Sequence, residues 1–541
     1  MKHSLLGDDV PPGTSVRPQV RVPTPVFADR LWAWLASPGG FLAFAAGLLA
    51  FAVIGNAHLN GWSDVDYWEH LAAIVAFARN PLHPLNPYLA GGGSTHLFTP
   101  FHLFWGLIVA ATGVRAYAMA PLIAAVNMIL FLIGLRLMAA TLVGTAAYAV
   151  PLGLSMLLLW LAPPWWSGFP SLGLLPLTGS YPYWAALSIA LIALGTWSPG
   201  GQPWGQVLLG ALVALVFLIH PLTGSFLALV LTVRTLTEPS WRVATRVIRL
   251  APIALGLALS LAWPFFPVAG AISAAPAYAQ QGIAGDWHEF YSWFPVRLLP
   301  ASLGALYFVP AFRRGWPDWL GWVLAVCVAI YVVNGLLLRS AFLGRYIIYI
   351  ALVLQWGVVR WLYQARSAPW ARHGVAATIF LATIACTAVV EIRTALEWSP
   401  VLWTNQPHTP AGDRKNGDYV RRFERFAPFL SGRDIVMAGM QESWILPAVL
   451  GCRVVGVIHG TPFMDDYQAR RLAVQRFFDP AVRAQERVSI LARYGVTRVV
   501  LPQKDVPRLP GLDERTSLLF RDNYYDVRRV ESTRVVSAAP R

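Results

Sequence analysis

The sequence predicts a polytopic α-helical membrane protein that carries a small α/β domain at its C-terminus. Of its 541 residues, 56% are hydrophobic and only 13% are charged, whereas soluble proteins carry roughly 25% charged residues. Uncharged runs such as 41–59 and 322–338 are long enough to cross a hydrocarbon core of about 30 Å as helices. From about residue 405 the charge rises and short β-branched runs replace the long apolar ones.

The apolar runs predict about 11–13 membrane spans within residues 39–400. Helices are the expected elements because a helix satisfies its own backbone hydrogen bonds in lipid. The run 98–113 is apolar but short for a span, so whether it crosses the membrane stays open. The predicted spans are 41–59, 118–138, 142–162, 183–197, 205–220, 222–236, 248–267, 296–312, 318–338, 342–360 and 373–391.

Arginines in short loops predict the orientation. They crowd three loops, at 234–249, 313–314 and 360–372, and the positive-inside rule places such loops in the cytoplasm. The segment 1–38 is then cytoplasmic, and an odd number of spans, 11 or 13, puts the C-terminus outside. We expect the plasma (inner) membrane of a bacterium. These loops account for the net charge of +15, so no nucleic-acid partner is expected.

Residues 401–541 predict an extracytoplasmic α/β domain. The β-branched runs 434–438, 453–458 and 497–502 flank a stretch with helical spacing at 467–495, and strands that alternate with helices indicate this class. The segment "IHGTPF" (458–463) is interpreted as a plain connection from a strand to a loop.

A polar cluster follows the first span, in "GWSDVDYWEHLAAI" (61–74). On a helix, Asp66 and His70 share one face, Glu69 lies on a neighbouring face, and Asp64 precedes them as a candidate N-cap. A carboxylate in the first external loop (60–97) is suited to general-base catalysis, with Asp66 as first candidate and Asp64 as second. His70 is the third candidate catalytic residue, because of its spacing from Asp66. The alternative is a solvated interfacial helix flanked by belt aromatics.

Three histidines of the same region, His83, His96 and His102, suggest a metal set with Asp66. Their spacing fits no standard ligand pattern, so no metal or other cofactor is predicted, although a divalent metal is possible.

Three motifs resemble the GT-C superfamily of integral membrane glycosyltransferases, which includes protein O-mannosyltransferases and aminoarabinose transferases. They are "DVDYWEHLAAIVAFARN" (64–80), the proline-rich run into "TPFHLFWGLIVAATGVRAY" (99–117), and "GRYIIYIAL" (344–352). The resemblance implies an inverting transfer of a sugar from a polyprenyl-phosphate donor to an acceptor at the outer membrane face. The implied partners are the lipid-linked sugar, membrane lipids, and a glycan, lipid or protein acceptor.

Under this resemblance, the donor phosphate needs a cation near the outer membrane face. Arg345 is the candidate because a planar guanidinium suits phosphate; the alternative is a snorkelling anchor. His220, in "LIHPLTG", is a second donor-binding candidate, or else an ordinary histidine at a helix end. Glu69 is expected to contact substrate.

A second external segment, "GIAGDWHEFYSWFPVR" (282–297), places carboxylates beside aromatic rings, which suits a sugar. The alternative is an amphipathic turn at the membrane interface. Its candidate substrate-binding residues are Asp286, Trp287, His288 and Glu289.

Three other functions stay open: a lipid-linked polysaccharide polymerase or ligase, a transporter or flippase, and a non-catalytic assembly scaffold. A transporter predicts two similar halves and an interrupted, polar midplane, whereas these spans are nearly free of charge and show no internal repeat.

Overall fold

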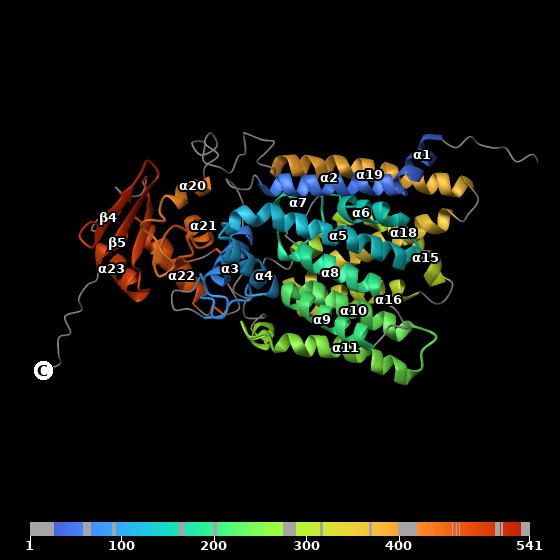
Figure 1. The fold of residues 1–541 in the computed structure, drawn as a ribbon, viewed down its shortest axis with the longest axis horizontal. Helices are drawn as coiled ribbons and strands as arrows, with labels where there is room; N and C mark the ends of the chain where they lie inside the picture. The colour runs from blue at the N-terminus through green and yellow to red at the C-terminus, as the bar shows by residue number, and fades with distance from the viewer. Residues whose placement is uncertain are drawn as a thin grey trace, which may run out of the picture.

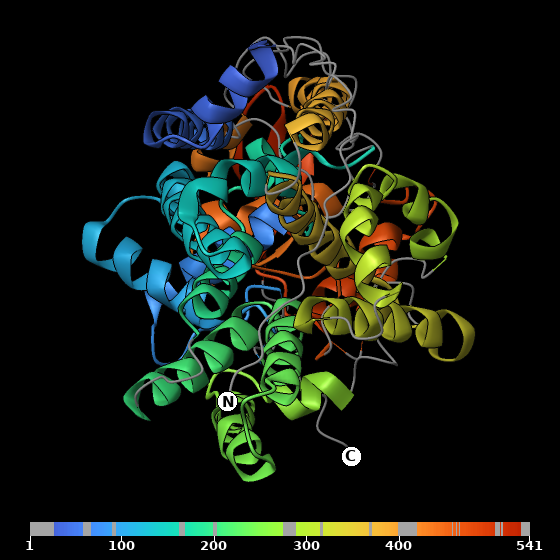
Figure 2. The same ribbon diagram turned by 90° about the vertical axis from the view of Figure 1, so that its right-hand side faces the viewer.

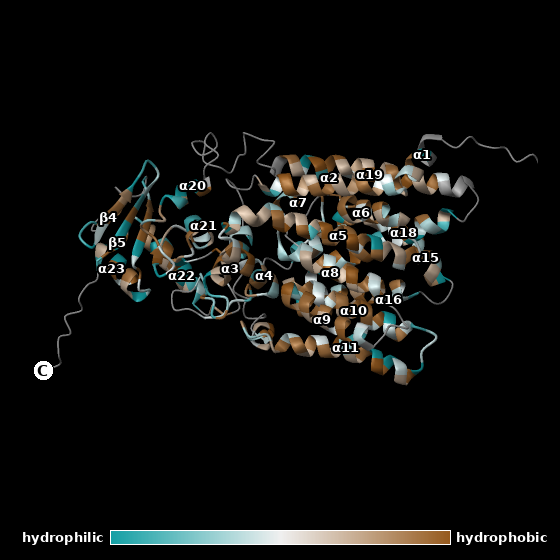
Figure 3. Cartoon of the chain, in the orientation of Figure 1, coloured by the Kyte–Doolittle hydropathy of each residue, from teal (hydrophilic) through white to brown (hydrophobic). Residues whose placement is uncertain are grey.

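The computed structural model describes residues 26–57, 66–88, 93–161, 168–197, 203–273, 288–313, 318–366, 370–398, 419–456, 458–460, 463–464, 466–503, 509 and 512–531. They form a helical bundle with an α/β domain at one end of it (Figure 1). The bundle is predominantly hydrophobic and the α/β domain more hydrophilic (Figure 3).

Within the described residues, six helical segments are long and apolar enough to cross a membrane. They are α2 (Pro38–Ala57), Ala116–Val143 with α5 (Ala120–Val143), α11 (Val243–Leu261), Trp319–Leu338 with α16 (Trp319–Val333), Ala341–Arg366 with α17 (Ala341–Gly344) and α18 (Ile347–Arg366), and α19 (Trp370–Trp398). The polytopic helical membrane class predicted from the sequence is confirmed.

Five shorter apolar helices complete the bundle. They are α4 (Pro100–Thr112), α6 (Ala149–Leu158), α8 (Pro182–Thr196), α9 (Pro203–Ile219) and α10 (Pro221–Thr237). Small residues let neighbouring helices approach: at Gly134 of α5, an added Cβ would lie 2.8 Å from Leu191 Cβ of α8. Figure 2 looks along the bundle and shows α2 (blue) and α19 (orange) at the same edge.

Two apolar runs differ from a simple span. The span predicted at 296–312 is wrong as one helix: the chain instead forms α14 (Phe294–Arg297), a 3₁₀ turn (Ala301–Gly304) and α15 (Ala305–Arg313). Pro300, the N-cap of the 3₁₀ turn, explains the break after α14, whereas Pro310 lies inside α15 and does not end it. The run 98–113 forms α4, whose 13 residues span about 20 Å, short of the hydrocarbon core.

Arg234 and Arg360, two arginines of the predicted cytoplasmic loops, lie beside the start of α16 at one end of the bundle, called here the arginine end. Arg234 donates to Leu194 O at 2.9 Å and lies over the rings of Trp197 and Trp319, at 4.2 and 4.9 Å. Helix α1 (Val26–Leu35) and α15 lie at this end, and the α/β domain lies at the other (Figure 1). The sequence predicted this separation of the arginine loops from the C-terminal region.

The α/β domain is built on one mixed sheet of order β2-β1-β3-β5-β4. Strand β1 runs parallel to β2 and β3, whereas β5 runs antiparallel to β3 and β4. The elements are α20 (Tyr419–Glu424), β1 (Ile435–Met437), α21 (Met440–Leu450), β2 (Arg453–Val454), α22 (Tyr467–Phe478), α23 (Ala484–Arg493), β3 (Arg498–Pro502), β4 (Thr516–Arg521) and β5 (Tyr525–Val530).

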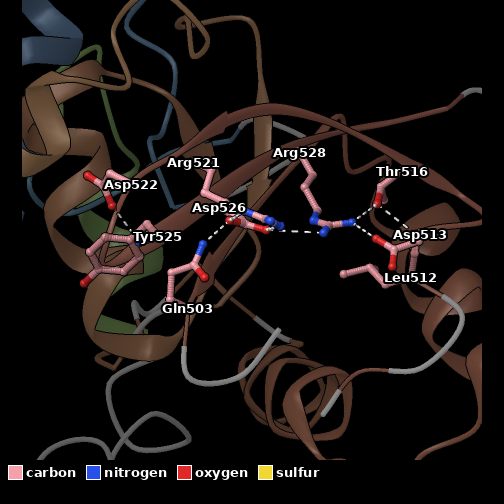
Figure 4. Close-up of polar contacts among 9 residues, drawn as sticks. All are labelled: Gln503, Leu512, Asp513, Thr516, Arg521, Asp522, Tyr525, Asp526 and Arg528. Carbon is pink, nitrogen blue, oxygen red and sulfur yellow. Dashed lines mark hydrogen bonds and ion pairs between the residues drawn. The ribbon is translucent and has the colours of Figure 1, made fainter. Parts of the chain in front are cut away.

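A buried carboxylate ties the last two strands together (Figure 4). Asp526 of β5 is fully buried and accepts hydrogen bonds from Arg521 at 2.8 and 2.7 Å and from Arg528 at 3.2 Å. Gln503, which follows β3, also donates to Asp526. This network links β3, β4 and β5.

Candidate functional site

Helix α3 (Asp66–Arg79) lies at the end of the bundle that carries the α/β domain, packed against α4 on one side and α21 on another. Its apolar residues are buried: Tyr67, Trp68, Leu71, Ile74 and Phe77. This burial fixes the rotation of α3 and points its first polar residues toward the α/β domain. One continuous apolar core runs from the bundle through α3 into the α/β domain.

Asp66 and Glu69 of α3 meet His459 of the α/β domain. The Nδ1 atom of His459 lies 3.5 Å from Asp66 Oδ1 and 3.3 Å from Glu69 Oε1. Trp444 of α21 donates from Nε1 to Glu69 Oε1 at 3.0 Å, and its ring packs against that of His459 at 5.2 Å. The α/β domain therefore supplies two side chains to the polar cluster of the first loop.

The cluster is partly shielded from water. Glu69 is 8% exposed, and this burial raises the pKa of its carboxyl, while the hydrogen bond and charge of His459 act in the opposite direction. Asp66 is less buried than Glu69. Two carboxyls three residues apart thus lie in different environments.

His70 and His102 extend the polar cluster of Asp66 and Glu69 toward the bundle. His70 Nδ1 lies 3.1 Å from His102 Nε2, and His102 Nδ1 lies 2.8 Å from Thr99 Oγ1. Burial lowers the pKa of His70 and of His96 to about 4. Both imidazoles are therefore neutral at pH 7.

His220 lies within electrostatic reach of His70 and of Arg345. It caps the N-terminus of α10: its Nδ1 accepts from Thr223 N at 3.3 Å and lies 2.8 Å from Thr223 Oγ1. His70 in turn interacts electrostatically with Asp66, so the first-choice residues for general base and phosphate binding share one electrostatic environment.

The second external segment meets Arg345 through Phe290, whose ring centroid lies 6.0 Å from Arg345 Cζ. His288 and Glu289 are exposed at the start of the four-residue helix α13 (Glu289–Ser292). Asp286, Trp287 and the second candidate base, Asp64, lie outside the described residues. The substrate-binding and catalytic roles of all five stay predictions.

The metal set considered from the sequence differs from the cluster found. Among the described residues, Asp66, Glu69 and His459 each offer one ligand atom, and these atoms lie within 4.8 Å of one another. By contrast, both ring nitrogens of His102 have partners in His70 and Thr99, and His83 is exposed.

Sequence reasoning missed His459 and Trp444. The segment "IHGTPF" held a signal, a histidine beside turn-forming residues, which was interpreted as a plain connection. The partners Trp444 and Glu69 are 375 residues apart in the chain, and local periodicity carries no information over such a separation.

Comparison with solved structures identifies proteins of similar fold. The structure of arabinofuranosyltransferase AftD from Mycobacteria aligns with a TM-score of 0.58 and 15% identity, over 91% of this chain and 40% of AftD. The structure of ArnT from Cupriavidus metallidurans is less similar, with a TM-score of 0.49 and 15% identity over 91% of this chain and 98% of ArnT. The Archaeoglobus fulgidus oligosaccharyltransferase aligns with a TM-score of 0.44 and 14% identity, over 85% of this chain and 69% of that protein.

No protein-family model and no curated protein matches the sequence. This chain spans only 40% of the length of AftD. The fold is GT-C-like, as the sequence resemblance predicted.

Proposed function

We propose that this protein is a membrane glycosyltransferase that moves a sugar from a polyprenyl-phosphate donor to an acceptor at the outer face of a bacterial plasma membrane. The observation that carries the proposal is the cluster in which Asp66 and Glu69 of α3 meet His459 of the α/β domain, at one end of a GT-C-like bundle. The name of AftD, an arabinofuranosyltransferase, supports glycosyl transfer as the type of reaction.

Asp66 is the proposed general base. It takes the proton from an acceptor hydroxyl or amine while that atom attacks the anomeric carbon from the face opposite the phosphate, so the configuration inverts. The less buried position of Asp66 leaves it more accessible to an acceptor than Glu69. Glu69, held by Trp444, is the proposed contact for substrate.

Arg345 is the proposed ligand of the donor phosphate. A guanidinium offers paired donors to phosphate oxygens, and Arg345 lies two residues before α18, which begins at Ile347. The N-terminus of a helix also favours an anion. His220 lies at the start of α10 and would orient the phosphate from the side of His70.

The test is sugar transfer by the purified full chain in proteoliposomes, with a panel of radiolabelled polyprenyl-phosphate sugars. Asp66→Asn should lower kcat by about 10²–10⁴-fold, the usual contribution of a general base, with donor binding retained. Arg345→Ala should instead weaken binding of polyprenyl phosphate.

The control for Asp66→Asn is Asp479→Asn, which changes an exposed aspartate of the α/β domain. The control for Arg345→Ala is Arg339→Asn, which changes an exposed arginine; its backbone φ of 52° is one that asparagine tolerates. Both should keep full activity. Unchanged kcat in Asp66→Asn would remove Asp66 as the base, and transfer from no polyprenyl-linked sugar would overturn the proposed function.

A further inference from the structure

We infer that one edge of the sheet in the α/β domain, where four of its strands start, is a docking surface for an acidic glycan, a saccharide chain that carries carboxylate or phosphate groups. This surface is called here the strand-start edge. The inference deepens the proposed function and rests on it for the class of partner.

The topology of the sheet brings one arginine from every strand to this edge. Strands β1, β2 and β3 run parallel, β5 runs antiparallel to β3, and β4 runs antiparallel to β5. The starts of β1 to β4 and the end of β5 therefore lie together. The arginines at these strand ends, or within two residues of them, are Arg453 (β2), Arg433 (β1), Arg498 (β3), Arg529 (β5) and Arg515 (β4).

The pairing register keeps these arginines in a row. Arg498 lies opposite Arg529, and Arg453 pairs with the first residue of β1. Because neighbouring strands lie about 4.8 Å apart, the row extends for about 19 Å across the five strands. Arg433, Arg515 and Arg529 are exposed to solvent.

A groove continues the row on the side of the helical bundle. Its lining consists of Arg79 of α3 together with Ser431, Gly432 and Arg433. Arg453 Nη2 donates to Arg433 O at 3.3 Å, which joins β2 to the same groove. Three arginines that are distant in the chain thus meet where α3 touches the sheet.

Positive charge exceeds negative charge along the edge. The acidic residues described within two positions of these strand ends are Asp434, Glu514 and Glu531. Asp434 is buried and lies 3.4 Å from Arg498, so this pair is matched internally. The excess of guanidinium groups favours an anionic partner, and a planar guanidinium pairs in a fork with carboxylate or phosphate.

The direction of the row favours a chain-like partner over a lipid surface. Strand β2 contacts the first external loop, since Val454 N donates to Pro87 O at 3.2 Å. Strands β4 and β5 lie at the end of the molecule farthest from the bundle (Figure 1). A lipid surface beside the bundle would meet Arg79 and leave Arg515 unused, whereas an extended polymer meets the whole row.

Helix α3 relates this edge to the proposed general base. Asp66 begins α3 and Arg79 ends it, and a helix of 14 residues spans about 20 Å. A glycan held at the strand-start edge would therefore reach Asp66 as an extended chain of several sugars. The α/β domain would then hold an acidic acceptor while its end is positioned for transfer.

The experiment measures glycan binding by the full-length protein in detergent, with no sugar donor present. The acidic probe is an oligogalacturonate, which carries a carboxylate on every sugar, and the neutral probe is a malto-oligosaccharide of equal length. Only the acidic probe should bind, and its Kd should rise with salt because exposed charge pairs are screened.

A triple variant locates the surface. Arg433→Gln, Arg515→Gln and Arg529→Gln together should raise the Kd for oligogalacturonate by about 10-fold or more, since three exposed charge pairs are lost. The control removes the same charge from three exposed arginines of the bundle, through Arg30→Gln, Arg242→Gln and Arg313→Gln, and should keep the Kd. Thermal unfolding checks that both variants fold, and Arg529→Gln alone should weaken binding by a smaller factor.

Equal loss of binding in the two triple variants, equal binding of the acidic and neutral probes, or binding of phosphatidylglycerol vesicles but not of oligogalacturonate would overturn the docking surface. Binding of the acidic probe by a protein that transfers no sugar would leave the surface standing while the proposed function falls. Sugar transfer by a protein that binds no acidic glycan would do the reverse.

Discussion

The Thr223 hydroxyl connects His220, a candidate ligand of the lipid-linked sugar donor, to helix α18 of the bundle. It lies 2.8 Å from His220 Nδ1 and 3.1 Å from the hydroxyl of Tyr349 in α18. Arg345 precedes the same helix. The orientation of His220 is therefore coupled through one buried hydroxyl to the helix that follows the candidate phosphate ligand.

Replacement of Thr223 by valine should weaken donor binding. The two side chains have nearly the same shape, so packing is kept while the hydrogen bonds to His220 and Tyr349 are lost. A lost hydrogen bond costs about 0.5–1.5 kcal/mol, which predicts a KM for the lipid donor raised about 2–10-fold with kcat nearly unchanged. Steady-state kinetics checks this, with Thr196→Val, an exposed threonine of α8, as control. A change confined to kcat would contradict the role.

At the scale of elements, the contact between α3 and α21 decides how the site is assembled. Arg79, in the last turn of α3, donates to the carbonyls of Leu450 and Gly451 at the end of α21. Helix ends leave such carbonyls without intrahelical partners and carry negative partial charge. Gly451 ends α21 with a φ of 64°, and a Cβ there would lie 2.3 Å from Arg79 Cζ.

Removal of this cap should loosen the α/β domain from α3. Arg79→Met keeps much of the apolar stem and loses the donors, so the free energy of unfolding should fall by about 1–3 kcal/mol. Thermal unfolding of the full chain measures this effect. Arg433→Met, which changes an exposed arginine of the α/β domain, should leave Tm within about 1 °C. Equal stability of the two variants would mean that the cap contributes nothing.

For the whole molecule, the two bundle ends differ in charge and in chemistry. The arginine end holds Arg234 and Arg360, the latter 3.6 Å from Asp318. The other end holds α3, the histidines and the α/β domain (Figure 1). The positive-inside rule then predicts that the site opens to the outer face.

Cysteine labelling in intact cells tests this orientation. A cysteine at the exposed position of His83 should react with a membrane-impermeant maleimide added outside. A cysteine at the exposed position of Arg242 should react only after the cells are permeabilised. Cys386 is the exposed native cysteine, so both variants are made in a Cys386→Ala background. The opposite labelling pattern would reverse the proposed orientation.

The sequence by itself determined the membrane class and the separation of arginine loops from the C-terminal region. These features follow from composition and local periodicity, which are properties of neighbouring residues. The same information failed at 296–312, where a break at Pro300 divides an apolar run into short helices.

Only the tertiary structure decided which residues meet. The packing of α3 between α4 and α21 brings Trp444 and His459 to Glu69, and the turn before α10 places His220 within electrostatic reach of both Arg345 and His70. These pairings depend on long-range burial of apolar faces. Burial chooses the rotation of each helix, and that rotation selects which polar side chains come together.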